Sequence, residues 1–204
     1  MDSASTIRNP CFHPKPIPLS TPQKMESASD LELIAAINAG DDAAFEVLYV
    51  RYRDWVVGLA RQFTGCDSLA NDVLQETFLY FLRKFPGFDL SSQLKTFLYP
   101  AVKNYSMNAH RKLARFQSGS DGQDEIDRLV APPSPLGASD DIAAMLSGLS
   151  EDHREILMLR YVDGLSMAEI AEATAIPLGT AKSRLHHAIV RVRQESETRG
   201  CSQF

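Results

Sequence analysis

The stretch from Ser166 to Gln194 constrains the fold most, because it has the pattern of two short helices joined by a tight turn. Ser166 and Glu169 have the S-x-x-E spacing of a capping box, in which each side chain hydrogen-bonds a free backbone N–H at the start of a helix. The turn is expected near residues 173–176. Pro177 lacks an N–H and has a preset φ, so it suits the first turn of the second helix. The stretch therefore predicts a helix-turn-helix.

The second of these helices has two different faces. Apolar residues recur at spacings of three and four and predict a buried stripe: Leu178, Ala181, Leu185, Ala188, Ile189 and Val192. The other face carries side chains able to donate to phosphates and base edges: Thr180, Lys182, Ser183, Arg184, His187 and Arg191. A helix with a merely solvated polar face would show the same charge pattern. The capped first helix and the turn favour DNA contact over that alternative.

Two motifs in this region resemble a known family. LMLRYVDGLSMAEIA at residues 157–171 and IPLGTAKSRLH at residues 176–186 resemble the C-terminal domain of bacterial sigma factors of the extracytoplasmic-function (ECF) group. In that family the second helix enters the major groove of the promoter −35 element. The resemblance implies that the polar face named above, from Thr180 to Arg191, contacts this element, although the family often has Arg where His187 stands.

Length and composition exclude several classes of protein. A chain of 204 residues, 44% of them apolar, is long enough for two small domains or one large one. No run approaches the roughly 18 apolar residues that a membrane span needs, and no secretion signal is apparent. The three cysteines, Cys11, Cys66 and Cys201, are scattered and odd in number, which fits a reducing cytoplasm better than a disulfide framework. No zinc-ligand spacing occurs, so we expect neither a metal nor a cofactor.

The charges are unevenly distributed along the chain. The formal net charge is −5, which argues against a protein that coats nucleic acid by itself. Residues 103–115 nevertheless hold four Lys and Arg residues and no acid, whereas residues 121–141 hold six acids and one Arg. Basic surfaces separated by an acidic segment would produce this balance.

The first half of the chain predicts an antiparallel bundle of helices. Apolar stripes indicate helices over residues 30–39, 42–64, 68–85 and 92–116, and stripes of this kind must face one another. In the third helix we expect the apolar stripe to be buried: Leu69, Val73, Leu74, Phe78, Phe81 and Leu82. The expected fold is therefore all-α, with this bundle followed by the helix-turn-helix.

The polar face of the third helix carries Asp72, Gln75 and Glu76. A solvated acidic face is the plain interpretation. However, the pattern A-x-D-x-x-Q-E-x-F at residues 70–78 resembles the sigma segment that docks on the clamp helices of the largest RNA polymerase subunit. By this resemblance the three side chains contact core polymerase.

The loop at residues 86–93 and the helix after it correspond, by the same resemblance, to the part of a sigma factor that melts and reads the −10 element. Extruding a base costs a few kcal/mol, so the protein needs stacking and hydrogen-bonding groups that offset this cost. The candidates are aromatic, amide and basic side chains: Phe88, Gln93, Lys95, Lys103, Asn104, Arg111 and Lys112. Phe97, where the family commonly has Trp, is read more simply as a core residue.

These assignments divide the chain into five parts. A Pro-rich extension covers residues 1–29, and residues 30–116 correspond to sigma domain 2. A flexible acidic linker, rich in Gly, Ser and Pro, covers residues 117–139. Residues 140–197 correspond to sigma domain 4 and are followed by a tail at 198–204.

We find no catalytic constellation and no glycine-rich phosphate loop, so we expect a protein that is not an enzyme. The resemblance implies an ECF sigma factor whose partners are promoter DNA and core RNA polymerase, at its clamp helices and flap, with no membrane. Anti-sigma factors commonly hold such proteins silent. The alternative is a helix-turn-helix regulator that binds DNA without polymerase and uses its bundle for dimerisation or sensing.

Overall fold

The computed structural model describes residues 26–118, 146 and 148–200. All the regular secondary structure among these residues is helical, which confirms the all-α prediction. The helices are α2 (Asp30–Asn38), α3 (Asp42–Thr64), α4 (Asp67–Leu82), α5 (Leu94–Ser118), α8 (Glu151–Tyr161), α9 (Met167–Thr174) and α10 (Leu178–Gly200). The predicted extension up to residue 25 and most of the predicted linker lie outside the described residues.

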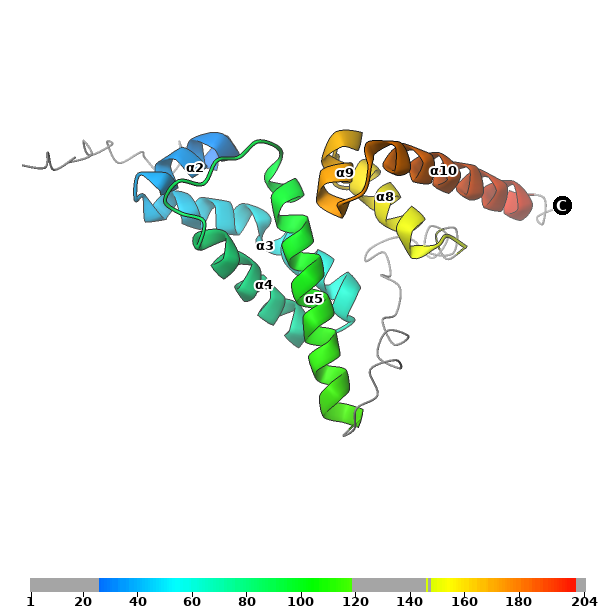
Figure 1. Cartoon of the computed structure of the whole chain (residues 1–204), viewed down its shortest axis with the longest axis horizontal. Coiled ribbons are helices and arrows are strands. Elements are labelled where there is room, and N and C mark those ends of the chain that lie inside the picture. Colours follow the sequence, from blue (N-terminus) through cyan, green and yellow to red (C-terminus); the bar gives the residue numbers. More distant parts are fainter. Residues whose placement is uncertain (1–25, 119–145, 147, 201–204) are drawn as a thin grey trace, which may run out of the picture.

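Helices α2 to α5, here the N-terminal helices, form the predicted bundle (Figure 1). The Asp41 side chain caps the start of α3 by accepting from the Ala43 N–H, and Gly65 ends the helix at φ 62°. A positive φ favours glycine, because it has no Cβ to clash with the backbone. The end of α3 is therefore fixed by the sequence.

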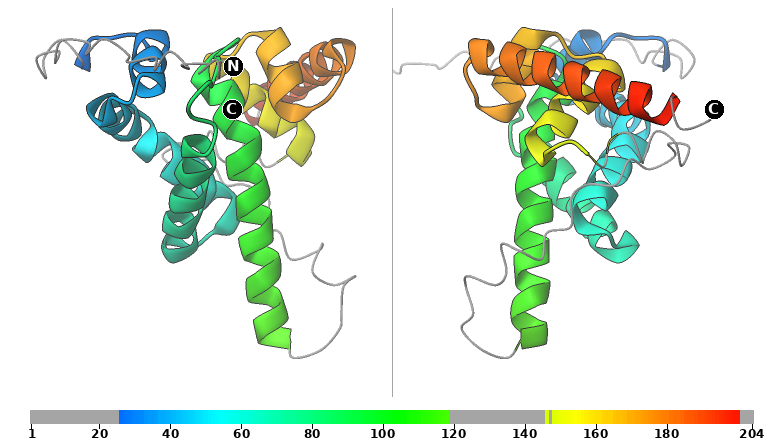
Figure 2. Two further views of the ribbon diagram at one scale, coloured as in Figure 1. Left: turned by 60° about the vertical axis from the view of Figure 1, so that its left-hand side comes forward. Right: turned by 90° about the vertical axis from the view of Figure 1, so that its right-hand side faces the viewer.

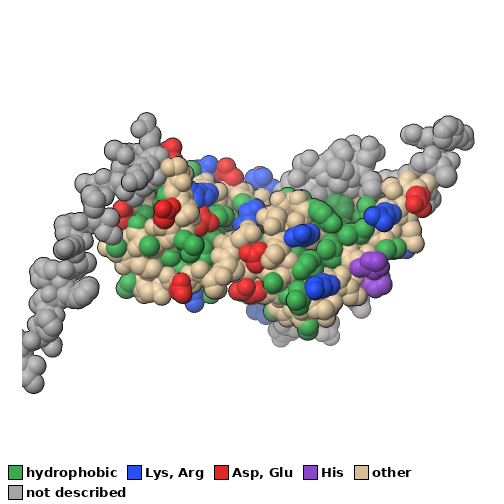
Figure 3. Space-filling model, turned by 90° about the horizontal axis from the view of Figure 1, so that it is seen from above, with side chains coloured by type: hydrophobic (Ala, Val, Ile, Leu, Met, Phe, Trp, Pro, Cys, Tyr) green, Lys and Arg blue, Asp and Glu red, His purple; other side chains and the backbone are tan. Residues whose placement is uncertain are grey.

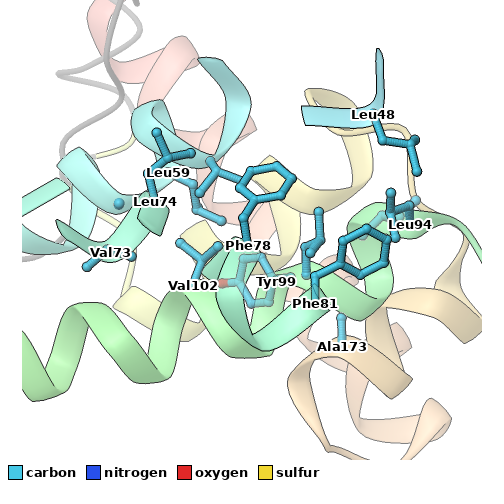
Figure 4. Packing of buried hydrophobic residues seen from close by; sticks show 14 of the residues in the cluster. Leu48, Leu59, Val73, Leu74, Phe78, Phe81, Leu94, Tyr99, Val102 and Ala173 are labelled. Carbon is cyan, nitrogen blue, oxygen red and sulfur yellow. The ribbon is translucent and has the colours of Figure 1, made fainter. Parts of the chain in front are cut away.

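The core of the bundle is formed mostly by apolar residues of α3, α4 and α5, to which α2 adds Leu33 and Ile34 (Figure 4). The residues include Leu48, Val56 and Ala60 of α3, Val73, Phe78 and Phe81 of α4, and Leu94, Leu98 and Val102 of α5. Burial of a large apolar side chain contributes about 1.5–3 kcal/mol, so this core supplies the main driving force for folding the bundle.

Helices α8 to α10, here the C-terminal helices, contain the predicted helix-turn-helix. The Ser166 hydroxyl accepts from the Glu169 N–H and the Glu169 carboxylate accepts from the Ser166 N–H, so the capping box is confirmed. Ala175 follows α9 at φ 54°, and α10 begins three residues later. Buried apolar residues hold these helices together: Ile156, Leu159, Leu165, Ile170, Ala181 and Ala188.

The C-terminal helices pack against the first half of α5, whereas the second half of α5 projects away from them (Figures 1 and 2). The buried residues of both groups of helices join in one hydrophobic cluster. No helix among the described residues has the length and apolar character that a membrane span requires.

Two side chains of the apolar stripes predicted for α4 and α10 are exposed rather than buried. Leu82 is 38% exposed and Leu178 is 43% exposed. Leu82 is the last residue of α4, and Leu178 is the first residue of α10. Periodicity predicts which side of a helix faces the core, but at a helix terminus the packed partner can end before the stripe does.

Candidate nucleic-acid interface

The surface of α4 presents the three predicted polymerase contacts to solvent. Asp72, Gln75 and Glu76 are all exposed, and Leu79 beside them is 48% exposed. These four positions share one face because side chains three and four residues apart are neighbours on a helix. The structure therefore brings the predicted residues together and adds an apolar side chain to the same surface.

The loop between α4 and α5 is tied to the end of α2 by Asn38. The Asn38 Oδ1 accepts from the backbone N–H groups of Gly87, at 2.6 Å, and Phe88, at 3.1 Å. Its Nδ2 donates to the Phe88 carbonyl at 2.8 Å. A side chain distant in sequence thus fixes the backbone of the candidate −10 loop, and no sequence motif pointed to it.

The Phe88 side chain lies in a cluster of aromatic rings. Its ring centroid is 4.7 Å from that of Phe97 and 5.5 Å from those of Phe81 and Phe85. Ring pairs at these separations add about 0.5–1.5 kcal/mol beyond area burial. The packing therefore anchors the loop and leaves Phe88 and Phe97 only partly exposed.

One face of α5 carries Lys95, Tyr99 and Lys103, which are spaced by four residues. Lys103 Nζ lies 2.6 Å from Glu155 Oε1 of α8, and the Tyr99 hydroxyl donates to the same oxygen at 2.5 Å. Burial, followed by the Glu155 carboxylate, raises the pKa of Tyr99 well above its ordinary value. Tyr99 is 2% exposed and was missed by the sequence interpretation, because it stands at the edge of the apolar stripe.

Asp163, in the loop between α8 and α9, contacts the same part of the bundle. Its Oδ1 accepts from the Trp55 indole N–H at 2.6 Å and lies 3.4 Å from Lys95 Nζ. The Lys95 ammonium is also 5.5 Å from the centroid of the Trp55 ring, within the range of a cation–π interaction. Both groups of helices thus meet at a charged contact.

Glu169 of α9 reaches the residue before α5. Its carboxylate accepts from the Gln93 backbone N–H at 3.1 Å and from the Gln93 amide at 3.4 Å. Burial alone would raise the pKa of Glu169, but hydrogen bonds from Ser166 and from the Gln93 N–H lower it below its ordinary value. The predicted capping residue therefore has a second role as a contact between the two groups of helices.

The seven candidate −10 residues fall into separate places. Gln93, Lys95 and Lys103 contact the C-terminal helices, whereas Phe88 lies in the aromatic cluster. The others lie on later turns of α5, where Asn104 and Lys112 are exposed and Arg111 is partly exposed.

The candidate −35 residues lie on α10 as predicted. Lys182, Ser183, His187 and Arg191 are exposed, and Thr180 and Arg184 are partly exposed. Arg184 Nη2 forms an ion pair with Asp152 of α8 at 2.7 Å. Seen from above (Figure 3), basic and histidine side chains surround a hydrophobic strip over the right-hand part, where α10 runs. Most acids on that face lie farther left.

The histidines near the start of α10 lie close to one another and to His153 of α8. The ring centroids of His153 and His187 are 6.2 Å apart, and those of His186 and His187 are 5.8 Å apart. Among the described residues, no three His, Cys, Asp or Glu side chains are arranged to hold a metal ion. The arrangement is suited to binding surfaces, with polar donors presented on two helices.

Two family models match the chain in the order that the motifs predict. Residues 48–116 match region 2 of the sigma-70 family, and residues 139–192 match its region 4. The first match runs from within α3 to near the end of α5, and the second includes the helix-turn-helix. Their joint occurrence is much more specific than a lone helix-turn-helix.

Several characterised proteins are similar along most of their length. The ECF RNA polymerase sigma factor SigW of Bacillus subtilis (strain 168) is 28% identical over 175 residues, which cover 79% of this chain and 94% of SigW. The ECF RNA polymerase sigma-E factor of Escherichia coli (strain K12) is 30% identical over 177 residues, covering 80% of this chain and 92% of that protein.

Solved structures agree with this fold. The sigma factor RpoE of Bartonella quintana, in complex with the anti-sigma factor NepR, superposes with a TM-score of 0.55 at 26% identity, covering 74% of this chain and 94% of that one. CnrH, in complex with the cytosolic domain of CnrY, shares the fold with a TM-score of 0.57 at 22% identity, covering 83% and 97%. The chain therefore belongs to the ECF group of RNA polymerase sigma factors.

Proposed function

We propose that this chain binds core RNA polymerase and directs initiation at promoters whose −10 and −35 elements it reads. The observation that carries the proposal is the ordered pair of matches to sigma regions 2 and 4, supported by 30% identity across 92% of a sigma-E factor. A regulator that acts without polymerase is not favoured, because such a protein would need only the DNA-binding region.

The polymerase contact is assigned to α4. Asp72, Gln75 and Glu76 offer two carboxylates and an amide, and Leu79 offers an exposed apolar group beside them. A surface that combines one or two apolar anchors with charged groups is typical of protein interfaces. The partner is the clamp-helix region of the largest subunit, with the flap as a second contact made by the C-terminal helices.

The −35 element is assigned to the exposed face of α10. Basic groups supply the salt-dependent attraction to phosphates, and Arg184 can donate two hydrogen bonds to guanine. Its ion pair with Asp152 orients the guanidinium while leaving the side chain 31% exposed. The surface consists of Thr180, Lys182, Ser183, Arg184, His187 and Arg191.

The −10 element is assigned to the loop before α5 and to the polar face of that helix. Gln93 and Lys95 provide donors near the loop, and Lys103, Asn104, Arg111 and Lys112 extend the polar surface along the helix. Phe88 supports the loop through its ring contacts. We assign the reading unit to residues 30–116 and the upstream DNA unit to residues 140–197.

Two further properties follow from this role. The chain acts in the cytoplasm, where RNA polymerase and promoter DNA meet, and it leaves the chemistry of RNA synthesis to the polymerase. We also infer an anti-sigma factor as a partner, because both solved relatives described above are complexes, one of them with a named anti-sigma factor.

Run-off transcription tests the proposal. The purified chain is mixed with core polymerase and a library of genomic fragments from its own organism. Discrete transcripts that require both the chain and particular fragments are expected. Transcription that is equally strong without the chain would overturn the proposed function.

A further inference from the structure

A cavity of about 180 Å³ lies where α3 and α5 meet α8. Its walls are mostly apolar and aromatic, and they include Trp55, Leu59 and Phe63 of α3, Tyr99 of α5, and Met158 and Leu159 of α8. Voids larger than a water molecule are few in closely packed proteins, and dry apolar cavities of about 150 Å³ bind single aromatic rings. The cavity therefore has the size and the lining for a ligand with one aromatic ring.

Gly58 leaves one wall of this cavity without a side chain. It lies inside α3, where glycine is less favourable than other residues because it loses more backbone freedom on folding. A Cβ added at Gly58 would meet no heavy atom within 4 Å. The space beside Gly58 can therefore accept a side chain, or part of a bound molecule.

The most buried charged groups of the lining are already bonded within the chain. Glu155 and Asp163 form ion pairs with Lys103 and Lys95, at 2.6 and 3.4 Å. Arg154 is 7% exposed and donates to two backbone carbonyls of the segment before α8. A charged ligand would lose its hydration here without gaining a free partner of opposite charge, so the cavity favours a neutral molecule.

The Gln62 side chain offers the cavity an unused hydrogen-bonding group. It is half-buried, and no other residue in the described part of the chain hydrogen-bonds its amide. An amide can both donate and accept, so it can bond a ligand hydroxyl in either direction. A few polar groups in an apolar lining are typical of small-molecule sites, which often lie between domains.

We propose that this cavity binds a small neutral phenol, with its ring against the aromatic wall and its hydroxyl hydrogen-bonded to Gln62. The site is separate from the surfaces assigned to promoter DNA and to polymerase on α4 and α10. It therefore adds a small-molecule ligand to the partners of the chain and goes beyond the proposed function.

Trp55 reports binding directly, because it is the single tryptophan of the chain and lines the cavity. Phenol titrated into the full chain should change the Trp55 emission in a saturable way. Gly58→Leu fills the space beside α3 and should weaken phenol binding by roughly tenfold or more. Ala43→Leu, at an exposed position of the same helix, should bind phenol like wild type.

Phenol binding by Gly58→Leu at the wild-type level would overturn the site, as would equal weakening by Ala43→Leu. If Gly58→Leu lost its helical circular dichroism, Gly58→Ala would decide, since it adds only one methyl group to the cavity. Weaker phenol binding by Gly58→Ala would support the site, and unchanged binding would overturn it.

Four probes with one ring each test the class of ligand: phenol, toluene, benzoate and benzylamine. Phenol should bind most tightly, and equal or tighter binding of either charged probe would overturn the assignment to a neutral ligand. The benzylamine arm also tests Glu151, the exposed carboxylate of the lining. Gln62→Leu should weaken phenol binding by about two- to tenfold and leave toluene binding as in wild type. Unchanged phenol affinity in this variant would overturn the hydroxyl contact.

The outcome is independent of the proposed function. Absence of saturable binding by all four probes would refute the ligand site and leave the transcription assay unaffected. Failure of the wild-type chain to support transcription with core polymerase would refute the proposed function instead, whatever the Trp55 emission shows.

Discussion

Replacing Asn38 by Ala removes the side chain that ties the loop between α4 and α5 to the end of α2. Three hydrogen bonds are lost: two that Gly87 and Phe88 donate to Oδ1 and one that Nδ2 donates to Phe88. Each hydrogen bond contributes a net stabilisation of about 0.5–1.5 kcal/mol, so losing all three would cost about 1.5–4.5 kcal/mol of stability. The lower half of this range applies, because the bond from the Gly87 N–H is exposed to solvent.

Amide hydrogen exchange measures this loss of stability directly at the loop between α4 and α5. A loss of about 2 kcal/mol should speed exchange of the Gly87 and Phe88 amides by roughly 30-fold, whereas amides in the middle of α3 should change less. Open-complex formation with core polymerase should fall, because the loop to which we assign the −10 element is no longer held. Polymerase binding through α4 should remain.

Asn38→Asp is the matched control. A carboxylate keeps an acceptor for both N–H groups and loses only the bond that Nδ2 donates to the Phe88 carbonyl. Asn38→Asp should therefore keep more of the protection of the Gly87 and Phe88 amides against hydrogen exchange than Asn38→Ala does. If the Asn38→Ala protein showed wild-type amide exchange at the loop and wild-type promoter opening, the aromatic cluster alone would hold the loop. The role given to these hydrogen bonds would then be refuted.

Three further predictions concern other parts of the chain. Arg184→Ala should weaken binding to a −35 duplex by about 1–3 kcal/mol in a fluorescence-anisotropy titration, and unchanged affinity would remove its assigned role. Ser166→Ala should lower the free energy of unfolding by about 1 kcal/mol in urea titrations, since it removes the hydroxyl that accepts from the Glu169 N–H at the start of α9. Equal midpoints and slopes would contradict this. Burial and then neighbouring carboxylates raise the pKa values of Tyr52 and Tyr99 above the ordinary 10.0, so the stability that they contribute is complete below pH 10 and declines as the pH rises above it. Tyr99→Phe should reduce this alkaline loss in urea titrations, and an identical pH profile would oppose the assignment.

Local signals in the sequence predicted the helices well. The bounds of α3 agree with the prediction because Asp41 and Gly65 act within a few residues of the helix ends. The capping box of Ser166 and Glu169 likewise depends on a spacing of three residues. Such signals are readable because the interacting groups are neighbours in the chain.

The exposure of the polar helix faces was also predictable. Asp72 and Glu76 lie opposite the buried stripe of α4, and periodicity alone places them in solvent. Their partner came from the resemblance to sigma factors, because an acidic helix face by itself does not specify what binds it.

Contacts between distant segments could not be read from the sequence. Asn38 and Phe88 are 50 residues apart, and Trp55 and Asp163 are 108 residues apart. Periodicity places a side chain on a face of its own helix but does not say which other element covers that face. The contacts of Glu155 with Lys103 and of Glu169 with Gln93 belong to this class, as does the burial of Tyr99.

Gel filtration of the chain with core RNA polymerase tests the central claim most directly. The wild-type chain should co-elute with the polymerase in a one-to-one complex. Asp72→Lys combined with Glu76→Lys should elute alone while keeping its helical circular dichroism, because the change reverses the charge of an exposed surface without touching the core. Co-elution of this variant at the wild-type level would contradict the assigned α4 surface, and absence of a wild-type complex would contradict the function as a sigma factor.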